Sequence, residues 1–183
     1  LHVGYVGHLY QGRGIDLILA LAARCHWADF EIVGGMEEDV NYWKSQPGLP
    51  ENLHFHGHLP YNDAAKIRQS CQVLLAPFAR ELAVFGGGAD TSKWMSPMKI
   101  FEYMATARAI VSSDLPVLRE VLTDGENALL CEPENPDDWQ RALETLRDDT
   151  DLAQRLGRQA FNDLESRYTW SSRAQSVLSD IRL

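Results

Sequence analysis

The chain has 183 residues, of which 45% are apolar and 23% are charged, and its net charge is −9 at pH 7. This length is enough for one domain with a sizeable core, and the composition is that of an ordinary globular protein, which excludes the disordered and fibrous classes. The acidic balance argues against a nucleic-acid partner, although two or three local donors suffice to bind a small anion.

Short apolar strands alternate with amphipathic helices through most of the chain. Strands are expected at 2–7, 29–35, 52–58, 71–78, 108–114 and 127–133, and helices at 13–25, 37–46, 61–71, 96–107 and 116–122. This alternation indicates parallel βαβ units, so we expect an α/β fold with a Rossmann-like, doubly wound parallel sheet and helices on both faces.

After Pro133 the pattern predicts helices alone, at 136–149, 151–167 and 170–183. We expect these extra C-terminal helices to pack around the sheet edge or to reach towards a further domain. The long connection from Ala79 to Met95 has no regular pattern and contains Gly86-Gly87-Gly88. Loops of this length in a compact domain are usually functional or mobile.

The first strand-to-helix turn, Gly7 to Gly14, has the character of an anion site. Glycines let the backbone approach a ligand closely, and Arg13 supplies a permanently charged fork that suits phosphate oxygens. The alternative is that Gly12 and Gly14 merely form a tight turn and Arg13 is solvated.

A second anion site is predicted where the helix 96–107 begins. Ser96 is a good N-cap and Pro97 a favoured first helical residue, so the following amides point outwards at the positive end of the helix dipole. Lys99 adds a cation, and Glu102 lies on nearly the same helix face. A carboxylate there suits sugar hydroxyls better than phosphate; the alternative is a surface Lys99–Glu102 ion pair of little energetic value.

Together the two turns predict a diphosphate and a ribose side by side, as in a nucleotide-sugar site. Here the sequence resembles the C-terminal half of the retaining glycosyltransferases of the group 1, or family 4, type with the GT-B fold. The resemblance covers essentially the whole chain and rests, in order, on GYVGHLYQGRGIDLI, EIVGG, NLHFHGHLP, VLLAPF, SPMKIFEYMATARAIVSSDLPVLREVL and DGENALLCEPENPDDW.

The resemblance implies that residues 1–183 bind a UDP- or GDP-linked sugar donor, whereas a separate N-terminal domain, absent from this chain, binds the acceptor. The implied donor-binding residues are Gly7, His8, Arg13, Gly34, His58, Leu59, Ser96, Pro97, Met98, Lys99 and Glu102. By this resemblance Glu102 corresponds to the second Glu of the family's paired-glutamate motif, which is expected to hold the ribose hydroxyls. Gly34, His58 and Leu59 correspond to positions where strand ends are expected to approach the base.

The family pattern is broken eight residues before Glu102, where Trp94 replaces the first glutamate of that motif. The usual carboxylate contact to the donor sugar is then absent or supplied elsewhere, with Glu81 and Asp90 as candidates. Arg13 and Lys99 are the predicted catalytic residues, since with the helix amides they would stabilise negative charge on the departing diphosphate. No metal or other cofactor is then required.

Other readings remain open. A nucleotide-sugar epimerase or hydrolase of the same architecture would need acid and base residues in the cleft, which the sequence does not offer. A non-catalytic nucleotide-binding module would be favoured if Arg13→Ala and Glu102→Ala left the nucleotide affinity unchanged. His54, His56 and His58 alternate along one strand, which is ligand-like, but they lack carboxylate or Cys partners at suitable spacing. The DxD at Asp149 to Asp151 is better explained as a helix cap.

The three cysteines, Cys25, Cys71 and Cys131, are far apart and have no CxxC spacing, which predicts reduced, buried thiols in a cytoplasmic protein. No apolar run approaches the roughly 20 residues that cross a bilayer. We therefore expect a nucleotide-sugar as the partner and no nucleic acid, and peripheral membrane association of the full-length enzyme stays an open alternative.

Overall fold

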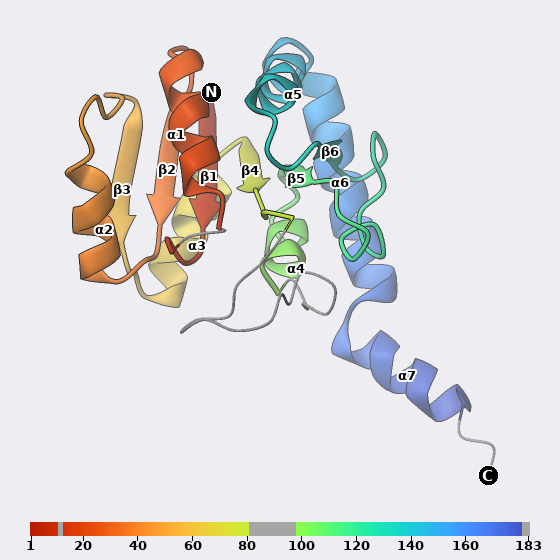
Figure 1. Ribbon diagram of the computed structural model, residues 1–183. Helices are drawn as coiled ribbons and strands as arrows, with labels where there is room; N and C mark the ends of the chain where they lie inside the picture. The colour runs from red at the N-terminus through yellow and green to blue at the C-terminus, as the bar shows by residue number, and fades with distance from the viewer. Residues whose placement is uncertain (11–12, 81–97, 181–183) are drawn as a thin grey trace.

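A six-stranded parallel sheet lies at the centre of the computed structural model, which describes residues 1–10, 13–80 and 98–180 (Figure 1). The strands are β1 (His2–Val6), β2 (Asp29–Val33), β3 (Leu53–Gly57), β4 (Val73–Ala76), β5 (Ala109–Ser113) and β6 (Leu129–Cys131). The helices are α1 (Ile15–Arg24), α2 (Glu37–Lys44), α3 (Tyr61–Ser70), α4 (Met98–Met104), α5 (Pro136–Asp148), α6 (Thr150–Arg167) and α7 (Trp170–Asp180).

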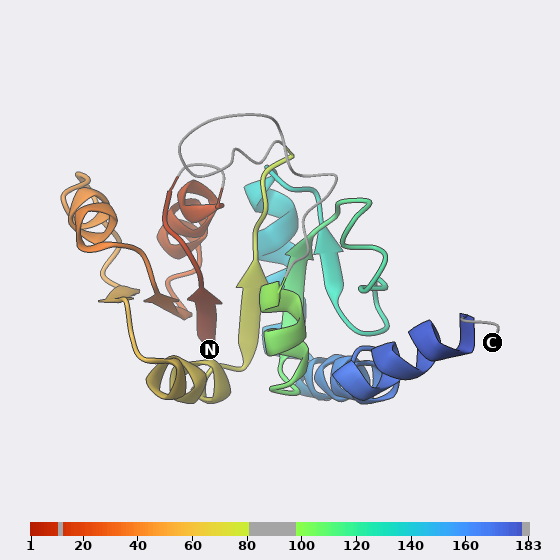
Figure 2. The same ribbon diagram turned by 90° about the horizontal axis from the view of Figure 1, so that it is seen from below.

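The strand order is β3-β2-β1-β4-β5-β6, and all neighbouring strands are parallel. The chain runs outwards from β1 to β3 and then returns through α3 to β4. Because such crossovers are right-handed, this reversal puts α1 and α2 on one face and α3 and α4 on the other (Figure 2). The prediction of a Rossmann-like, doubly wound sheet is confirmed, and its switch point lies between β1 and β4, where ligands of such sheets bind.

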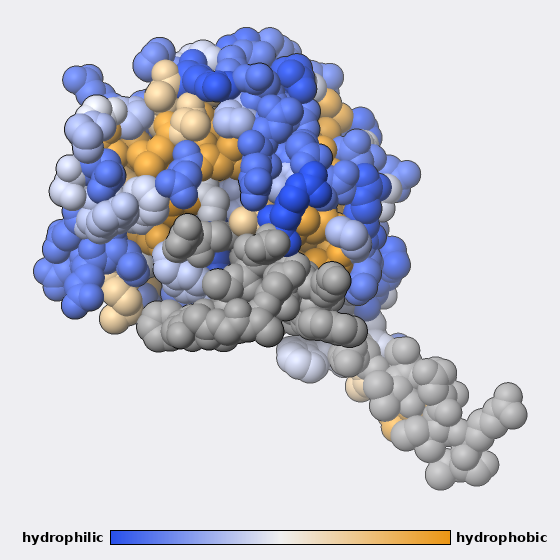
Figure 3. Space-filling model, in the orientation of Figure 1, coloured by the Kyte–Doolittle hydropathy of each residue, from blue (hydrophilic) through white to orange (hydrophobic). Residues whose placement is uncertain are grey.

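Apolar residues fill both sides of the sheet. Phe30, Ile18 and Trp139 belong to the core beneath α1 and α5, whereas Leu74 and Ile100 belong to the core beneath α4. Burial of each such side chain contributes roughly 1.5 to 3 kcal/mol. The face of the molecule seen in Figure 3 is hydrophilic over much of its area, with apolar residues visible in patches.

The three C-terminal helices differ in whether they pack against the sheet. Helices α5 and α6 pack on opposite faces of the sheet, whereas α7 extends away from the body of the molecule (Figures 1 and 2). The side chain of Asp149 accepts a hydrogen bond of 2.8 Å from the amide of Leu152 at the start of α6, so its predicted role as a helix cap is confirmed.

The helix predicted at 116–122 is wrong, because this segment forms consecutive turns. The amides of Leu118 and Arg119 bond to the carbonyl of Leu115, and those of Val121 and Leu122 bond to the carbonyl of Leu118. These are two successive turns that are not joined into a continuous helix. Asn127 then ends the segment, since its amide group donates to the carbonyl of Val121 and its side-chain oxygen accepts from the amide of Thr123.

All three cysteines are free and buried, as predicted. Burial raises the pKa of Cys25 to about 11 and the pKa values of Cys71 and Cys131 to about 12, which suppresses the reactive thiolate. Within the described ranges, no helix combines the length and the apolar character needed to cross a membrane.

Candidate functional site

The carboxyl ends of β1, β2 and β3 are joined through glycine backbone. The amide of Gly7 donates to the carbonyl of Val33 at 2.9 Å, and the amide of Gly34 donates to the carbonyl of Gly57 at 2.7 Å. Gly34 has φ of 113°, and a Cβ there would lie 2.1 Å from the carbonyl oxygen of Gly7. The predicted residues Gly7 and Gly34 are therefore in direct backbone contact. His58 follows Gly57 at the end of β3.

A cavity of about 500 Å³ opens at the ends of β2 and β3, beside the start of α2. It is lined by Gly35, Met36, Glu37, Val40, Gly57 and His58. The structure thus brings His58 to this cavity, whereas Leu59 is half-buried beyond it in the chain. Sequence reasoning missed the lining residues of α2, because an amphipathic helix start gives no sign of the cavity next to it.

Lys99 crosses from α4 to the end of β1, at the switch point of the sheet. Its Nζ lies 4.3 Å from the centroid of the Tyr5 ring and 4.9 Å from that of Phe78. It is also close to Gly7, where an added Cβ would lie 2.9 Å from the Lys99 Nζ. Cation–π contact with two rings fixes the ammonium group at the mouth of the β1–β4 crevice.

The environment of Lys99 disfavours its charged form. Burial and, to a smaller extent, the nearby positive charge of Arg13 lower the pKa of Lys99 from 10.5 to about 7, although Glu102 opposes this change. Arg13 is therefore close enough to act on Lys99, and the two form a local positive site when Lys99 is protonated.

This lowered pKa gives the stability of the chain a pH dependence of defined sign. Between pH 7 and 10.5 an unfolded lysine is protonated whereas the folded Lys99 is not, so the free energy of unfolding rises with pH across that window. We expect wild-type stability, measured by urea titration, to rise relative to that of a Lys99→Met variant between about pH 7 and pH 9. A difference between the two chains that stays constant over this range would contradict the assignment.

Arg13 lies against the same crevice. Its guanidinium donates to the hydroxyl of Tyr10 and lies 4.8 Å from the centroid of that ring. The next residue, Gly14, has φ of 77°, and a Cβ there would lie 2.3 Å from the carbonyl oxygen of Pro77, so the β1–α1 turn is pressed against the end of β4. The buried Nε of Arg13 has no hydrogen-bond partner in the described part of the chain.

Glu102 lies one turn further along α4 and forms an ion pair with Arg68 of α3, whose Nη1 is 3.0 Å from Oε2. The alternative of a surface Lys99–Glu102 pair therefore does not describe this carboxylate. Sequence reasoning missed Arg68 because its partner lies 34 residues away.

Of the remaining predicted residues, His8 and Met98 are described in the structure and the others are not. His8 is exposed, and its carbonyl accepts a 2.7 Å hydrogen bond from the hydroxyl of Tyr5. Met98 is exposed at the start of α4. The predictions on Ser96, Pro97, Trp94, Glu81, Asp90 and Gly86 to Gly88 lie outside the described residues.

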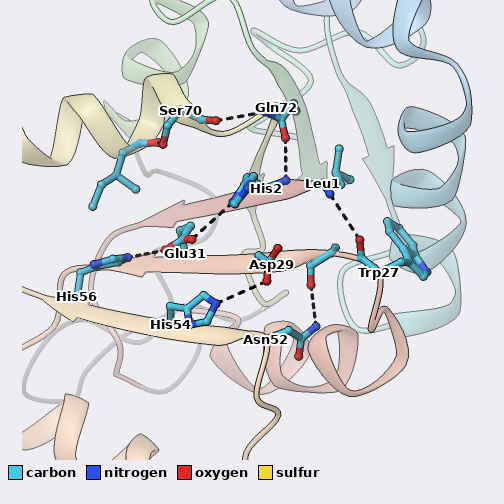
Figure 4. A network of polar contacts seen from close by, with 12 residues as sticks. Leu1, His2, Trp27, Asp29, Glu31, Asn52, His54, His56, Ser70 and Gln72 are labelled. Carbon is cyan, nitrogen blue, oxygen red and sulfur yellow. Dashed lines mark hydrogen bonds and ion pairs between the residues drawn. The ribbon is translucent and has the colours of Figure 1, made fainter.

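Two of the three strand histidines, His54 and His56, face carboxylates of the neighbouring strand (Figure 4). His54 faces Asp29 at 3.6 Å and His56 faces Glu31 at 2.5 Å, each from β3 to β2. The expectation that these histidines lack carboxylate partners is therefore wrong for His54 and His56, because the partners come from the neighbouring strand, whereas His58 lines the cavity. Among residues with described placement, no cluster of three or more His, Cys, Asp or Glu side chains could hold a metal ion.

Comparison with known proteins gives one consistent result. Residues 1–149 match the family model of the group 1 glycosyl transferases. An uncharacterized glycosyltransferase of Methanocaldococcus jannaschii is 24% identical over 172 residues, which cover 91% of this chain and 41% of the relative. The chain thus spans less than half the length of that relative.

Solved structures share the fold. The C-terminal domain of the group 1 family protein LpcC from Francisella tularensis superposes with a TM-score of 0.72 at 17% identity, over 92% of this chain and 86% of that domain. Anabaena HepE, solved in complex with UDP, superposes with a TM-score of 0.78 at 16% identity, over 98% of this chain and 49% of HepE. The chain belongs to the group 1 glycosyl transferases, and its sheet has the fold of their C-terminal domain.

Proposed function

We propose that the β1–β4 crevice binds the diphosphate of a nucleoside-diphosphate sugar, the donor for transfer of the sugar to an acceptor. The observation that carries the proposal is the placement of Lys99, whose Nζ is held between Tyr5 and Phe78 beside Gly7. Arg13 adds a second cation, and a phosphate oxygen would satisfy its unpaired Nε.

The cavity at the ends of β2 and β3 suits the base of the same nucleotide. Its lining combines glycine backbone with the side chains of Met36, Val40 and His58, which offers an apolar surface and a polar edge for a planar ring. Glu102 would then accept hydrogen bonds from the ribose hydroxyls. HepE is solved both with UDP and with UDP-glucose, which supports this class of ligand.

In this proposal the crevice residues promote transfer by electrostatic stabilisation of the leaving group. As the bond from the sugar to the diphosphate breaks, negative charge grows on the departing phosphate. The permanent charge of Arg13 stabilises it, and so does Lys99 in its protonated form, which a bound diphosphate favours. We propose that the transfer retains the configuration at the anomeric carbon and needs no metal. The acceptor would be bound by a separate domain, so residues 1–183 alone should bind the donor without turnover.

A thermal-stabilisation panel tests the proposal. UDP, GDP and ADP should be compared with the matching nucleosides and with inorganic pyrophosphate. At a concentration of 100 Kd, a bound diphosphate should raise the melting temperature by about 5 to 10 °C, because only the folded chain binds it. Equal shifts with uridine or guanosine would place the binding energy in the base cavity and overturn the diphosphate assignment.

A further inference from the structure

Arg68 is a buried cation between α3 and α4. The residue is only 4% exposed, whereas charged side chains are rarely buried to this extent. Its Nη1 donates to Oε2 of Glu102 at 3.0 Å, and its guanidinium lies 5.3 Å from the centroid of the Tyr61 ring. Its Nε is buried and has no partner among the residues that the structure describes.

Packing does not explain this arrangement. Burial of a guanidinium is costly unless its donors are paired, and Arg68 leaves the Nε donor unpaired. Replacing a buried ion pair by apolar residues is often neutral or stabilising. A Met or Leu would therefore fill the space between α3 and α4 at lower cost, which indicates that Arg68 acts on its partner.

The ion pair controls where the carboxylate of Glu102 lies. Arg68 takes one oxygen, Oε2, and the Glu102 side chain keeps 36% of its surface exposed. Lys99 lies three residues earlier on α4, within reach of a free Glu102 side chain. Without Arg68, Glu102 would be free to bond to Lys99 and would compete with a phosphate for it.

We infer that Arg68 is a positioning residue, which holds Glu102 away from Lys99 and directs its exposed oxygen to the ribose hydroxyls of a bound nucleoside diphosphate. The inference rests on the proposed function. It makes Arg68 a determinant of selectivity for ribonucleotides, because a fixed carboxylate accepts hydrogen bonds from the ribose hydroxyls and a deoxyribose lacks one of them. Arg68 itself is too deeply buried to touch the ligand.

The test is the ratio of affinities for a ribonucleoside diphosphate and its 2′-deoxy form, measured by calorimetry on the 183-residue chain. UDP with 2′-deoxy-UDP, or GDP with 2′-deoxy-GDP, is used according to which base binds. Wild type should bind the ribonucleotide about tenfold or more tightly, because loss of one hydrogen bond to a charged group typically weakens affinity by at least this factor. Arg68→Met and Glu102→Gln should each bring the ratio to about one.

Two further variants separate positioning from stability. Arg68→Lys keeps the charge without the fork and should keep part of the preference, roughly threefold. Leu146→Ala removes a buried side chain from α5, on the other face of the sheet, and should lower the melting temperature without changing the ratio.

The outcomes distinguish the two proposals. If wild type binds no nucleoside diphosphate, the proposed function fails. If wild type binds and discriminates, but Arg68→Met and Arg68→Lys keep the full ratio, the positioning role alone is overturned. It is also overturned if wild type binds both sugars equally. Should Arg68→Met not fold, the ratio in Arg68→Lys decides.

Discussion

Replacement of Lys99 by methionine is expected to weaken the binding of a nucleoside diphosphate by about 10- to 100-fold, the range for lost hydrogen bonds to a charged group. Methionine keeps the unbranched apolar stem between Tyr5 and Phe78, so the core should tolerate it. The variant therefore removes the cation with little change in packing, and calorimetry with UDP and GDP measures the loss.

Lys66→Met is the matched control. Lys66 is an exposed lysine of α3 that pairs with Asp63, and it lies on the outer side of the molecule. The same chemical change there should leave affinity within about twofold of wild type, because exposed ion pairs contribute little. Equal affinity losses in the two variants would mean that net charge, rather than the crevice, governs binding.

Gly34→Ala is expected to destabilise the chain by about 3 kcal/mol or more. Two costs combine at this position. Its φ of 113° is unfavourable for any residue with a side chain, and the new Cβ would lie 2.1 Å from the backbone oxygen of Gly7. The backbone would have to separate at the ends of β1 and β2, so the variant should also lose nucleotide binding.

Gly48→Ala isolates the first of these costs. Gly48 has φ of 74°, but a Cβ there meets no atom within 4 Å. This control should lose about 1 kcal/mol from conformational strain alone. Denaturant titrations of the two variants measure the difference, and a Gly34→Ala loss no larger than that of Gly48→Ala would show that the strand ends are not in close contact.

The fold was predictable because the signals are local. Apolar runs such as DFEIV indicate strands, and segments such as IDLILALAAR have the apolar spacing of a helix. The alternation of the two predicts a parallel sheet. The prediction failed at 116–122, where the apolar spacing resembles that of a helix but the backbone forms two separate turns, closed on the carbonyls of Leu115 and Leu118. The side chain of Asn127 completes that turn, and its contribution is not visible in the spacing.

The candidate site was predictable in its residues more than in its geometry. The motif marks Arg13, Lys99 and Glu102 as polar groups at helix starts, but it does not reveal what surrounds them. The aromatic rings around Lys99 come from β1 and from the end of β4, and the partner of Glu102 comes from α3. Such contacts join distant segments, so they appear only when the sheet is assembled.

The most direct measurement is a calorimetric titration of the wild-type 183-residue chain with UDP and with GDP at neutral pH. A donor site at the β1–β4 crevice predicts saturable binding of at least one of them at one site per chain, with the affinity reduced in both Arg13→Ala and Lys99→Met. Absence of binding by every nucleoside diphosphate, or binding unchanged in both variants, would contradict a donor site in this crevice.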